Sequence, residues 1–295
     1  MRWTPLVAAT FSGQYRAFEH VYPTVRRHVT QPFGGTHVSF VFITPEPPCS
    51  GGVCKRGSVR HVSSKKGEWT NVSDMSVRAS LLTLPCGGYF VYGSWSAPSL
   101  APCKQDSMFA KHAQQWEKVQ HVFHLVELYE TQQRIQFDWV LRLRTDLFFL
   151  APVPHHSTLA AGVHVPLGMT TGTSLNDQLA IASRAHASSY FELADELSCS
   201  GNWSGSWSTP VSDNASSGGL MLGRLRRWRA PVHLHAFGYV LVRPAREAGG
   251  HVYECGRLQN KYVPQTRQFY SSCLQLCRAL VQMGPTVNRE QAQCA

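Results

Sequence analysis

The segment 137–149 reads FDWVLRLRTDLFF and is the clearest β-strand of the chain. Aromatic, β-branched and long apolar residues dominate it, and Pro152 and Pro154 follow closely, where a strand has to stop. Successive side chains of a strand point to opposite faces. One face therefore carries Asp138, Val140, Arg142, Arg144 and Asp146, and the other carries Trp139, Leu141, Leu143 and Thr145.

Charged residues on one face of a central strand need a physical explanation. Burial without partners is costly, so these side chains either pair with one another or face a solvated site. Ligands of open α/β sheets bind at the carboxyl ends of the strands, and Asp146 stands at such an end. We therefore expect a functional site here, with a purely structural Arg–Asp ion-pair network as the alternative.

The segments around this strand predict an α/β fold. Residues 6–10 form an apolar run, a helical pattern follows through Val29, and 38–44 reads VSFVFIT, which is typical of a strand. A strand, a helix and a strand at this spacing predict a βαβ unit and a parallel sheet. Apolar residues at three- and four-residue steps predict a long helix over 109–133.

Local patterns predict the other elements of a single domain spanning 1–295. Asn176 followed by Asp177 is a typical helix start, so we expect a helix from there to about residue 197. Segments 45–75 and 199–219 are rich in Gly and Ser and are expected to be insertion loops. We also expect strands over 88–94, 163–166 and 232–242, and helices over 220–228 and 270–283.

The composition indicates a folded domain with an anionic partner. Hydrophobic residues make up 43% and charged residues only 16%, so a core can form and extended disorder is not expected. The formal net charge of +10 favours a phosphate-bearing ligand, an anionic surface or nucleic acid. The basic residues are scattered and no nucleic-acid-binding motif occurs, so nucleic acid is not the expected partner. No apolar run is long enough for a transmembrane helix.

Cysteines and sequons favour the secretory lumen. Nine Cys in one domain are typical of an oxidising compartment, and Cys49 with Cys54 is a candidate disulfide. Asn-x-Ser sequons stand at Asn71, Asn202 and Asn214, in polar stretches where a glycan could attach. The first ten residues are too short for a signal peptide and predict a strand instead. A cytoplasmic protein and a luminal one whose targeting segment is absent from this sequence both remain open.

The segment FDWVLRLRTDLFF resembles the central segment of GT-A type glycosyltransferase-like proteins, of the nucleotide-sugar transferase superfamily. In that fold a short acidic motif, often Asp-x-Asp, follows a strand and holds a divalent metal against the diphosphate of a sugar nucleotide. Arg144-Thr145-Asp146 stands in its place, so only the last acid matches. The resemblance implies a doubly wound, mostly parallel sheet flanked by helices, with Mn²⁺ or Mg²⁺ on Asp146. Arg144 can replace part of the metal's role, because a guanidinium neutralises diphosphate oxygens directly.

Other segments fit the same resemblance. FSGQYRAFEHVYPTV is similar to the first strand-to-helix turn of those proteins, which implies that Gly13, Gln14 and Arg16 contact the nucleotide. LNDQLAIASRAHASSYF is similar to a helix start that follows the metal motif, which implies that Asp177 orients donor or acceptor or completes the metal shell. Arg142 would add charge neutralisation. Gly218-Gly219 stands where a catalytic Glu would be sought, so the base is not assigned.

The resemblance implies a glycosyltransferase that moves a sugar from a UDP- or GDP-linked donor to a glycan or glycoprotein acceptor, with the Golgi as the expected compartment. Two alternatives stay open. A non-catalytic luminal relative would bind nucleotide or glycan without turnover, and a basic module would bind polyanions over its surface. His233 and His235 are weaker candidates for a metal, and Trp203 and Trp207 for sugar stacking.

Overall fold

The computed structural model describes residues 4–14, 18–44, 89–92, 108–167, 170, 173–196, 217–244 and 251–254. Several predicted features lie outside these ranges. They are Arg16, all nine Cys, the three sequons, Trp203, Trp207, the helix over 270–283 and most of both insertion loops.

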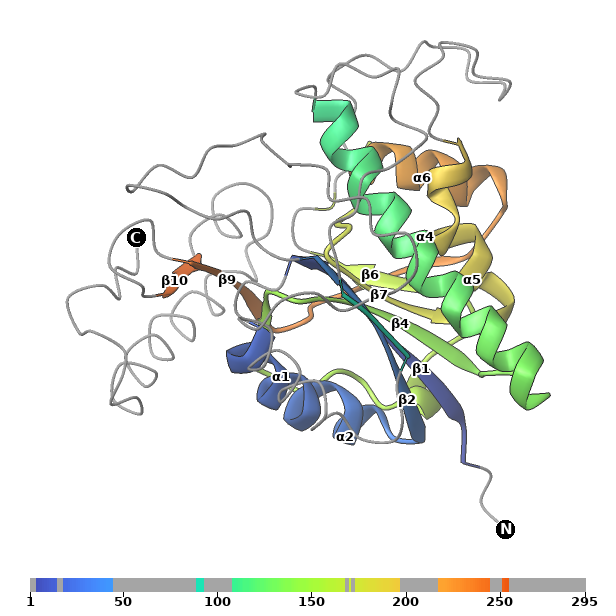
Figure 1. Cartoon of the computed structure of the whole chain (residues 1–295). Coiled ribbons are helices and arrows are strands. Elements are labelled where there is room, and N and C mark those ends of the chain that lie inside the picture. Colours follow the sequence, from blue (N-terminus) through green and yellow to red (C-terminus); the bar gives the residue numbers. More distant parts are fainter. Residues whose placement is uncertain are drawn as a thin grey trace.

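The fold is α/β, built on a seven-stranded mixed sheet in the order β3-β2-β1-β4-β7-β6-β8 (Figure 1). Four neighbouring pairs are parallel, and only the two pairs that β7 makes, with β4 and with β6, are antiparallel. The predicted mostly parallel sheet is thus confirmed, with β4 at its centre. The strands are β1 (Leu6–Gln14), β2 (Thr36–Thr44), β3 (Tyr89–Tyr92), β4 (Trp139–Arg144), β6 (Val163–Pro166), β7 (Leu179–Ser183) and β8 (Val232–His235).

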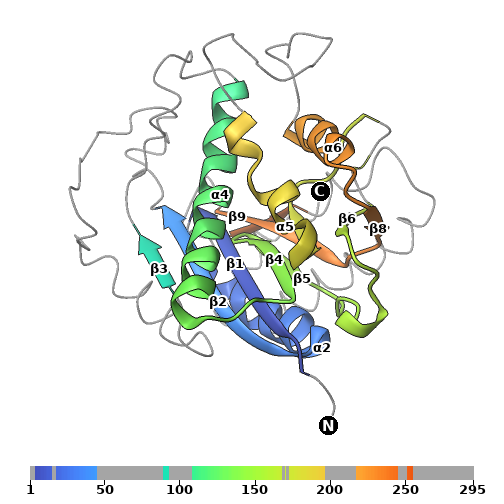
Figure 2. The same cartoon turned by 90° about the vertical axis from the view of Figure 1, so that its right-hand side faces the viewer.

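Helices cover both faces of this sheet (Figures 1 and 2). One face carries α4 (Met108–Gln133), α5 (Arg184–Phe191) and α6 (Ser217–Arg227). The other carries α1 (Phe18–Val25), which continues through a short π-helical segment (Arg26–Thr30) into α2 (Gln31–Phe33). Val140 packs into the first core, whereas Trp139, Leu141 and Leu143 pack into the second, as the alternation along β4 predicts.

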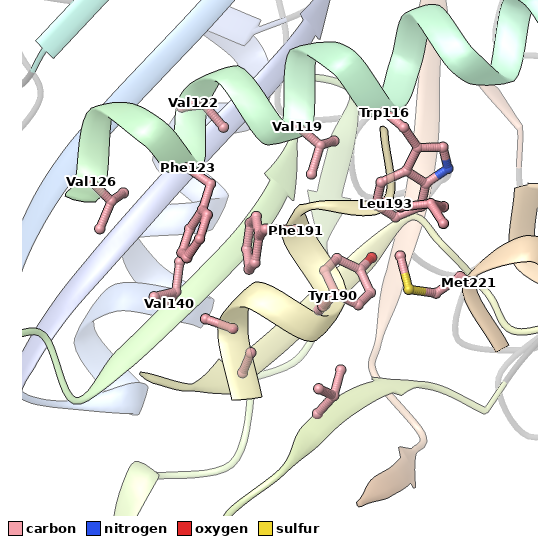
Figure 3. Close-up of a cluster of buried hydrophobic side chains, with 14 of the residues drawn as sticks. Trp116, Val119, Val122, Phe123, Val126, Val140, Tyr190, Phe191, Leu193 and Met221 are labelled. Carbon is pink, nitrogen blue, oxygen red and sulfur yellow. The ribbon is translucent and has the colours of Figure 1, made fainter. Parts of the chain in front are cut away.

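The apolar stripe of α4 forms the first core (Figure 3). Trp116, Val119, Phe123 and Val126 recur at helical spacing and are fully buried. Phe191 stacks on Phe123 with ring centroids 5.0 Å apart. Each such side chain contributes roughly 1.5–3 kcal/mol of hydrophobic stabilisation. The core therefore fixes the position of α4 over the centre of the sheet.

Two predicted strands each turn out to be two strands in different sheets. The segment 137–149 ends its first strand at Arg144, turns at Thr145 and Asp146, and resumes as β5 (Leu147–Phe149). The segment 232–242 divides into β8 and β9 (Tyr239–Pro244). β5 and β9 form a small sheet with β10 (His251–Glu254). Apolar residues resume directly after each turn, so the pattern alone does not show where a strand changes sheets.

The helix predicted from Asn176 is wrong for its first part. Leu179–Ser183 is strand β7, buried throughout between β4 and β6, and only Arg184 begins helix α5. The Asn176 Oδ1 atom accepts a hydrogen bond at 3.0 Å from the amide of Gln178, which is a local turn rather than a helix cap. The Leu-Ala-Ile-Ala run is short and apolar, a pattern that strands and buried helices share. Residues 217–219, expected in a loop, begin α6 instead.

The remaining predicted elements are close to those observed. The long helix, the short strands at 88–94 and 163–166, and the basic helix at 220–228 all exist within a few residues of their expected bounds. Within the described ranges, no helix is long and apolar enough to span a membrane.

Candidate functional site

The charged residues of β4 lie where three strand ends meet. Ser12 of β1 is in register with Arg144, and Leu179 at the start of β7 with Leu143. The carboxyl ends of β1 and β4 therefore adjoin the amino end of β7. Gly13 has a φ of 147°, and a Cβ there would lie 3.0 Å from the Thr145 hydroxyl oxygen. The backbones at the ends of β1 and β4 are thus close enough that a side chain at Gly13 would crowd the turn.

Arg144 and Asp146 form a bidentate ion pair across this turn. The Arg144 Nε and Nη2 atoms donate to the two Asp146 carboxylate oxygens at 2.8 and 2.9 Å. Asp146 is 1% exposed. Burial would lower the pKa of Arg144, but the neighbouring Asp146 outweighs it and raises that pKa. Arg144 therefore carries a permanent charge at the carboxyl edge of the sheet.

Arg142 lies deeper, against α4 and α5. Its guanidinium stands 4.8 Å from the centre of the Trp116 ring and donates from Nη1 to the Tyr190 hydroxyl at 3.2 Å. Figure 3 shows Trp116 and Tyr190 side by side in the core above the sheet. The Arg142 Nε atom is buried without a hydrogen-bond partner in the described part of the chain. Arg142 is thus a buried cation that depends on nearby carboxylates for charge balance.

Asp177 supplies a second carboxylate to the cluster. Gln115 Nε2 of α4 donates to its Oδ2 atom at 2.8 Å, and the Ser217 hydroxyl at the start of α6 donates to the same oxygen. Burial would raise the pKa of Asp177, but Arg142, Ser217 and Arg144 together lower it below its usual range. Asp177 is therefore a stable carboxylate, which is unsuited to act as a general base near neutral pH.

Tyr239 connects the cluster to the small sheet. The Asn176 side-chain amide donates to the Tyr239 hydroxyl oxygen at 2.9 Å. Tyr239 is 3% exposed, and burial raises its pKa. Its hydroxyl therefore stays protonated, and it lies close enough to Arg144 and Asp177 for their charges to act on it.

Most of the predicted site residues converge here. Gly13, Arg142, Arg144, Asp146 and Asp177 all contribute to the cluster, although Asp177 precedes a strand rather than a helix. Gln14 ends β1, and its side chain lies outside the described features, as does all of Arg16.

The sequence analysis missed several partners of these charges. They are Gln115, Trp116, Tyr190, Asn176, Ser217 and Tyr239. Trp116 and Tyr190 were indistinguishable from ordinary core residues in the sequence. Gln115 stands among other polar residues of α4, such as Lys111 and Lys118, and offered no signal either.

The described donors do not fit a divalent metal as they stand. Both Asp146 oxygens already accept hydrogen bonds from Arg144, and two guanidinium groups flank the carboxylates. In the described ranges, no three His, Cys, Asp or Glu side chains are grouped to hold a metal ion. A metal on Asp146 would first require the Arg144 pair to open.

Gly218 has a structural reason to be glycine. A Cβ atom there would collide with the carbonyl oxygen of Leu175 and approach the Ser174 hydroxyl to 2.5 Å. The Leu175 amide in turn donates to the Gly218 carbonyl at 3.1 Å. No side chain fits at this position, so a carboxylate base cannot come from Gly218.

Histidines form a separate cluster on β6 and β8, at one edge of the main sheet. His164 Nε2 lies 2.8 Å from the Ala160 carbonyl oxygen, which assigns the proton to Nε2 and leaves Nδ1 to accept from His235 Nε2 at 2.7 Å. His233 stacks on His164 with ring centroids 4.6 Å apart. Burial lowers the pKa of His164 to about 4. The predicted metal at His233 and His235 finds no group of three ligands in the described ranges.

Comparison with protein-family models and with curated proteins identifies no family for this chain. No protein-family model matches the chain, and no curated protein matches it either.

Proposed function

We propose that this protein is a glycosyltransferase of GT-A type, which moves a sugar from a nucleotide-sugar donor to a hydroxyl of a glycan or glycoprotein. One observation carries the proposal. Arg142, Arg144, Asp146 and Asp177 gather at the adjoining carboxyl ends of β1 and β4, beside Gly13. This is the edge at which α/β sheets bind their ligands.

Arg144 is the residue best placed to hold a diphosphate. Its guanidinium already binds a bidentate anion, the Asp146 carboxylate, and phosphate oxygens match the same geometry. Gly13 allows the end of β1 to approach the Thr145 side chain of this turn closely, which keeps the two strand ends together beside Arg144. In transfer, Arg144 would stabilise the charge that develops on the departing nucleotide diphosphate.

Arg142 and Asp177 would position the substrates and would not take part in bond making or breaking. Arg142 keeps Asp177 ionised, and Gln115 and Ser217 fix the orientation of its carboxylate. An ionised, oriented carboxylate accepts hydrogen bonds from sugar hydroxyls. Asp177 would therefore hold a hydroxyl of the donor sugar or of the acceptor.

Metal dependence stays a prediction of the family resemblance. When bound, Mn²⁺ or Mg²⁺ supplies charge neutralisation for the leaving diphosphate. The Arg144–Asp146 pair already places a cation at that edge without a metal. No step proposed for this chain depends on the ion, and the experiment below separates the two cases.

A second candidate is a luminal relative that binds nucleotide or glycan without transfer. The same pair favours it, since Asp146 is engaged by Arg144. The lack of space for a side chain at Gly218 also favours this second candidate, because no catalytic base can stand at that position. In either case the sequons and cysteines keep the secretory pathway, and the Golgi in particular, as the proposed location.

The experiment compares Arg144→Gln with Arg184→Gln. Arg184 forms an equivalent bidentate pair with Glu130 at the opposite end of β4 and serves as the matched control. Thermal shifts with UDP and GDP, each with and without Mn²⁺, report binding. Release of free nucleotide from a panel of UDP- and GDP-sugars, with and without glycan acceptors, reports turnover.

We expect nucleotide to raise the Tm of the wild type and of Arg184→Gln, but not of Arg144→Gln. Acceptor-dependent release would support the transferase, whereas binding without release would support the non-catalytic relative. A Tm rise that needs Mn²⁺ and is lost in Asp146→Asn would restore the metal expectation. No rise with any nucleotide would overturn the transferase and the nucleotide-binding relative, and it would favour a structural ion-pair network.

A further inference from the structure

The turn that follows α6 exposes a tryptophan among arginines. Trp228 is 58% exposed, the largest exposed fraction of any large apolar side chain in the described ranges. Arg226, Arg227 and Arg229, which surround it in the sequence, are exposed as well. An exposed aromatic ring among cationic side chains offers both a stacking face and charge to a ligand.

The ring of Trp228 is held in place from beneath. Arg224, only 2% exposed, stands 5.2 Å from its centre. Arg224 is itself fixed, because its Nε donates to the Ser189 carbonyl at 2.9 Å and its Nη2 lies 3.6 Å from a Glu192 carboxylate oxygen. Trp228 is thus a preorganised aromatic surface that rests on a buried cation.

Arg229 occupies a backbone conformation that favours glycine. Its φ is 51°, and the next amide, of Ala230, donates to the Leu225 carbonyl at 3.0 Å, as at a left-handed helix end. Glycine is the usual residue at this position, because a Cβ atom is strained there. The turn therefore retains an arginine side chain at a cost in stability.

Charge complementarity indicates the partner. The segment Ser217–Pro244 contains five arginines and no Asp or Glu. Basic residues at the end of a helix also stabilise the helix dipole. That effect explains the arginines of the last turn, but it explains neither the exposed ring nor the strained Arg229.

We propose that the turn 226–229 binds an acidic glycan. A sugar ring stacks on the exposed face of Trp228, and its carboxylate or sulfate groups bind Arg226, Arg227 and Arg229. This surface is separate from the charged cluster, since α6, at 1.5 Å per residue, carries it roughly 16 Å from Ser217. The binding does not depend on sugar transfer, so a protein without transferase activity would still show it.

The test is direct titration of the full chain with defined tetrasaccharides: a sulfated chondroitin tetrasaccharide, tetragalacturonate and neutral cellotetraose. Phosphatidylserine vesicles form a fourth arm. We expect the acidic tetrasaccharides to bind, cellotetraose to bind at least about tenfold more weakly, and salt to weaken the acidic ones. Trp228→Ala is expected to weaken binding of the acidic glycans about tenfold.

Arg229→Gly separates binding from folding. It is expected to raise the Tm, because it relieves the left-handed strain, and yet to weaken acidic-glycan binding. A triple variant of exposed arginines elsewhere, Arg26→Gln with Arg27→Gln and Arg134→Gln, controls for net charge.

Three results would overturn the proposal. A diffuse charge effect would be shown if the control triple variant weakened binding as much as the triple variant Arg226→Gln, Arg227→Gln and Arg229→Gln. Equal binding of cellotetraose, or no binding of either acidic tetrasaccharide, would exclude an acidic glycan. Vesicle binding that needs Trp228, without acidic-glycan binding, would assign the turn to a membrane surface instead.

Discussion

Two bidentate arginine–carboxylate pairs stand at opposite ends of β4 and differ in what they join. At the amino end, Arg184 of α5 binds Glu130 of α4 at 2.7 and 2.8 Å, and Glu130 also accepts from the Phe137 amide at 2.9 Å. At the carboxyl end, Arg144 binds Asp146, two residues away in the same turn. The first pair connects elements that are far apart in the sequence, whereas the second joins two residues of one turn.

This difference separates a structural ion pair from a candidate binding group. The Arg184–Glu130 pair closes the junction of two helices and a backbone amide. The Arg144–Asp146 pair lies within one turn, and it stands in a cluster with Arg142 and Asp177 at the carboxyl ends of β1 and β4. Equal chemistry at the two ends therefore allows matched tests of stability and of binding.

The largest expected effect is on stability at the amino end. Glu130→Ala leaves Arg184 with only its longer contact to Glu127 at 3.4 Å. It also removes the acceptor of the Phe137 amide, so we expect a loss of about 3 kcal/mol in the free energy of unfolding. Urea denaturation measures it. Asp146→Ala is expected to cost less, because its pair with Arg144 joins residues only two apart in the sequence. An equal or larger cost for Asp146→Ala would contradict the comparison.

The next effect exchanges arginine for lysine at both ends. Lysine keeps the charge but loses the bidentate geometry. Arg144→Lys is expected to weaken UDP binding about tenfold with little change in stability, and Arg184→Lys to lower stability with UDP binding unchanged. Calorimetric titration and urea denaturation on both variants give the two numbers. If both variants lose UDP binding equally, Arg144 does not bind the nucleotide directly.

Two glycines with similar backbone conformations give a third test. Gly13 and Gly162 have φ values of 147° and 145°, and a Cβ at Gly162 would lie 2.7 Å from the Pro231 carbonyl oxygen. We expect each substitution by alanine to cost about 1 kcal/mol or more of stability. Only Gly13→Ala is expected to weaken nucleotide binding, as measured by the UDP-dependent Tm shift. Loss of binding in Gly162→Ala would point to a general effect of destabilisation.

The sequence predicted the centre of the fold better than its edges. The alternation along β4 and the stripe of α4 each reflect burial on one side, which leaves a periodic trace. The strand β7 leaves no such trace, because it is buried on both faces, and a polar turn at Asn176 imitates a helix cap. The changes of sheet after Arg144 and His235 depend on partners far away in the chain.

The candidate site divides in the same way. Arg142, Arg144 and Asp146 were found because charges on an apolar strand conflict with burial, and that conflict is visible locally. Their partners Gln115, Ser217 and Tyr239 come from three other elements and become neighbours only through folding. The observed pairing of Arg144 with Asp146 was the alternative considered from the sequence, and the metal role of Asp146 stays a prediction.

A fourth test is a pH dependence that separates the histidine cluster from the charged site. Burial lowers the pKa of His164 to about 4 in the folded protein, against 6.5 when unfolded. Between these values the unfolded chain binds a proton that the folded one does not, so stability falls as the pH drops from about 6.5 to about 4. Asp177, whose pKa is lowered, loses its contribution only below its unfolded value of 3.8. His164→Gln is expected to reduce the pH dependence of stability, measured by urea denaturation, in the first range alone. Other histidines whose pKa values burial lowers, such as His37 and His121, keep their share of it. If Asp177→Asn flattened that range instead, the charged site rather than the histidines would control the response to mild acid.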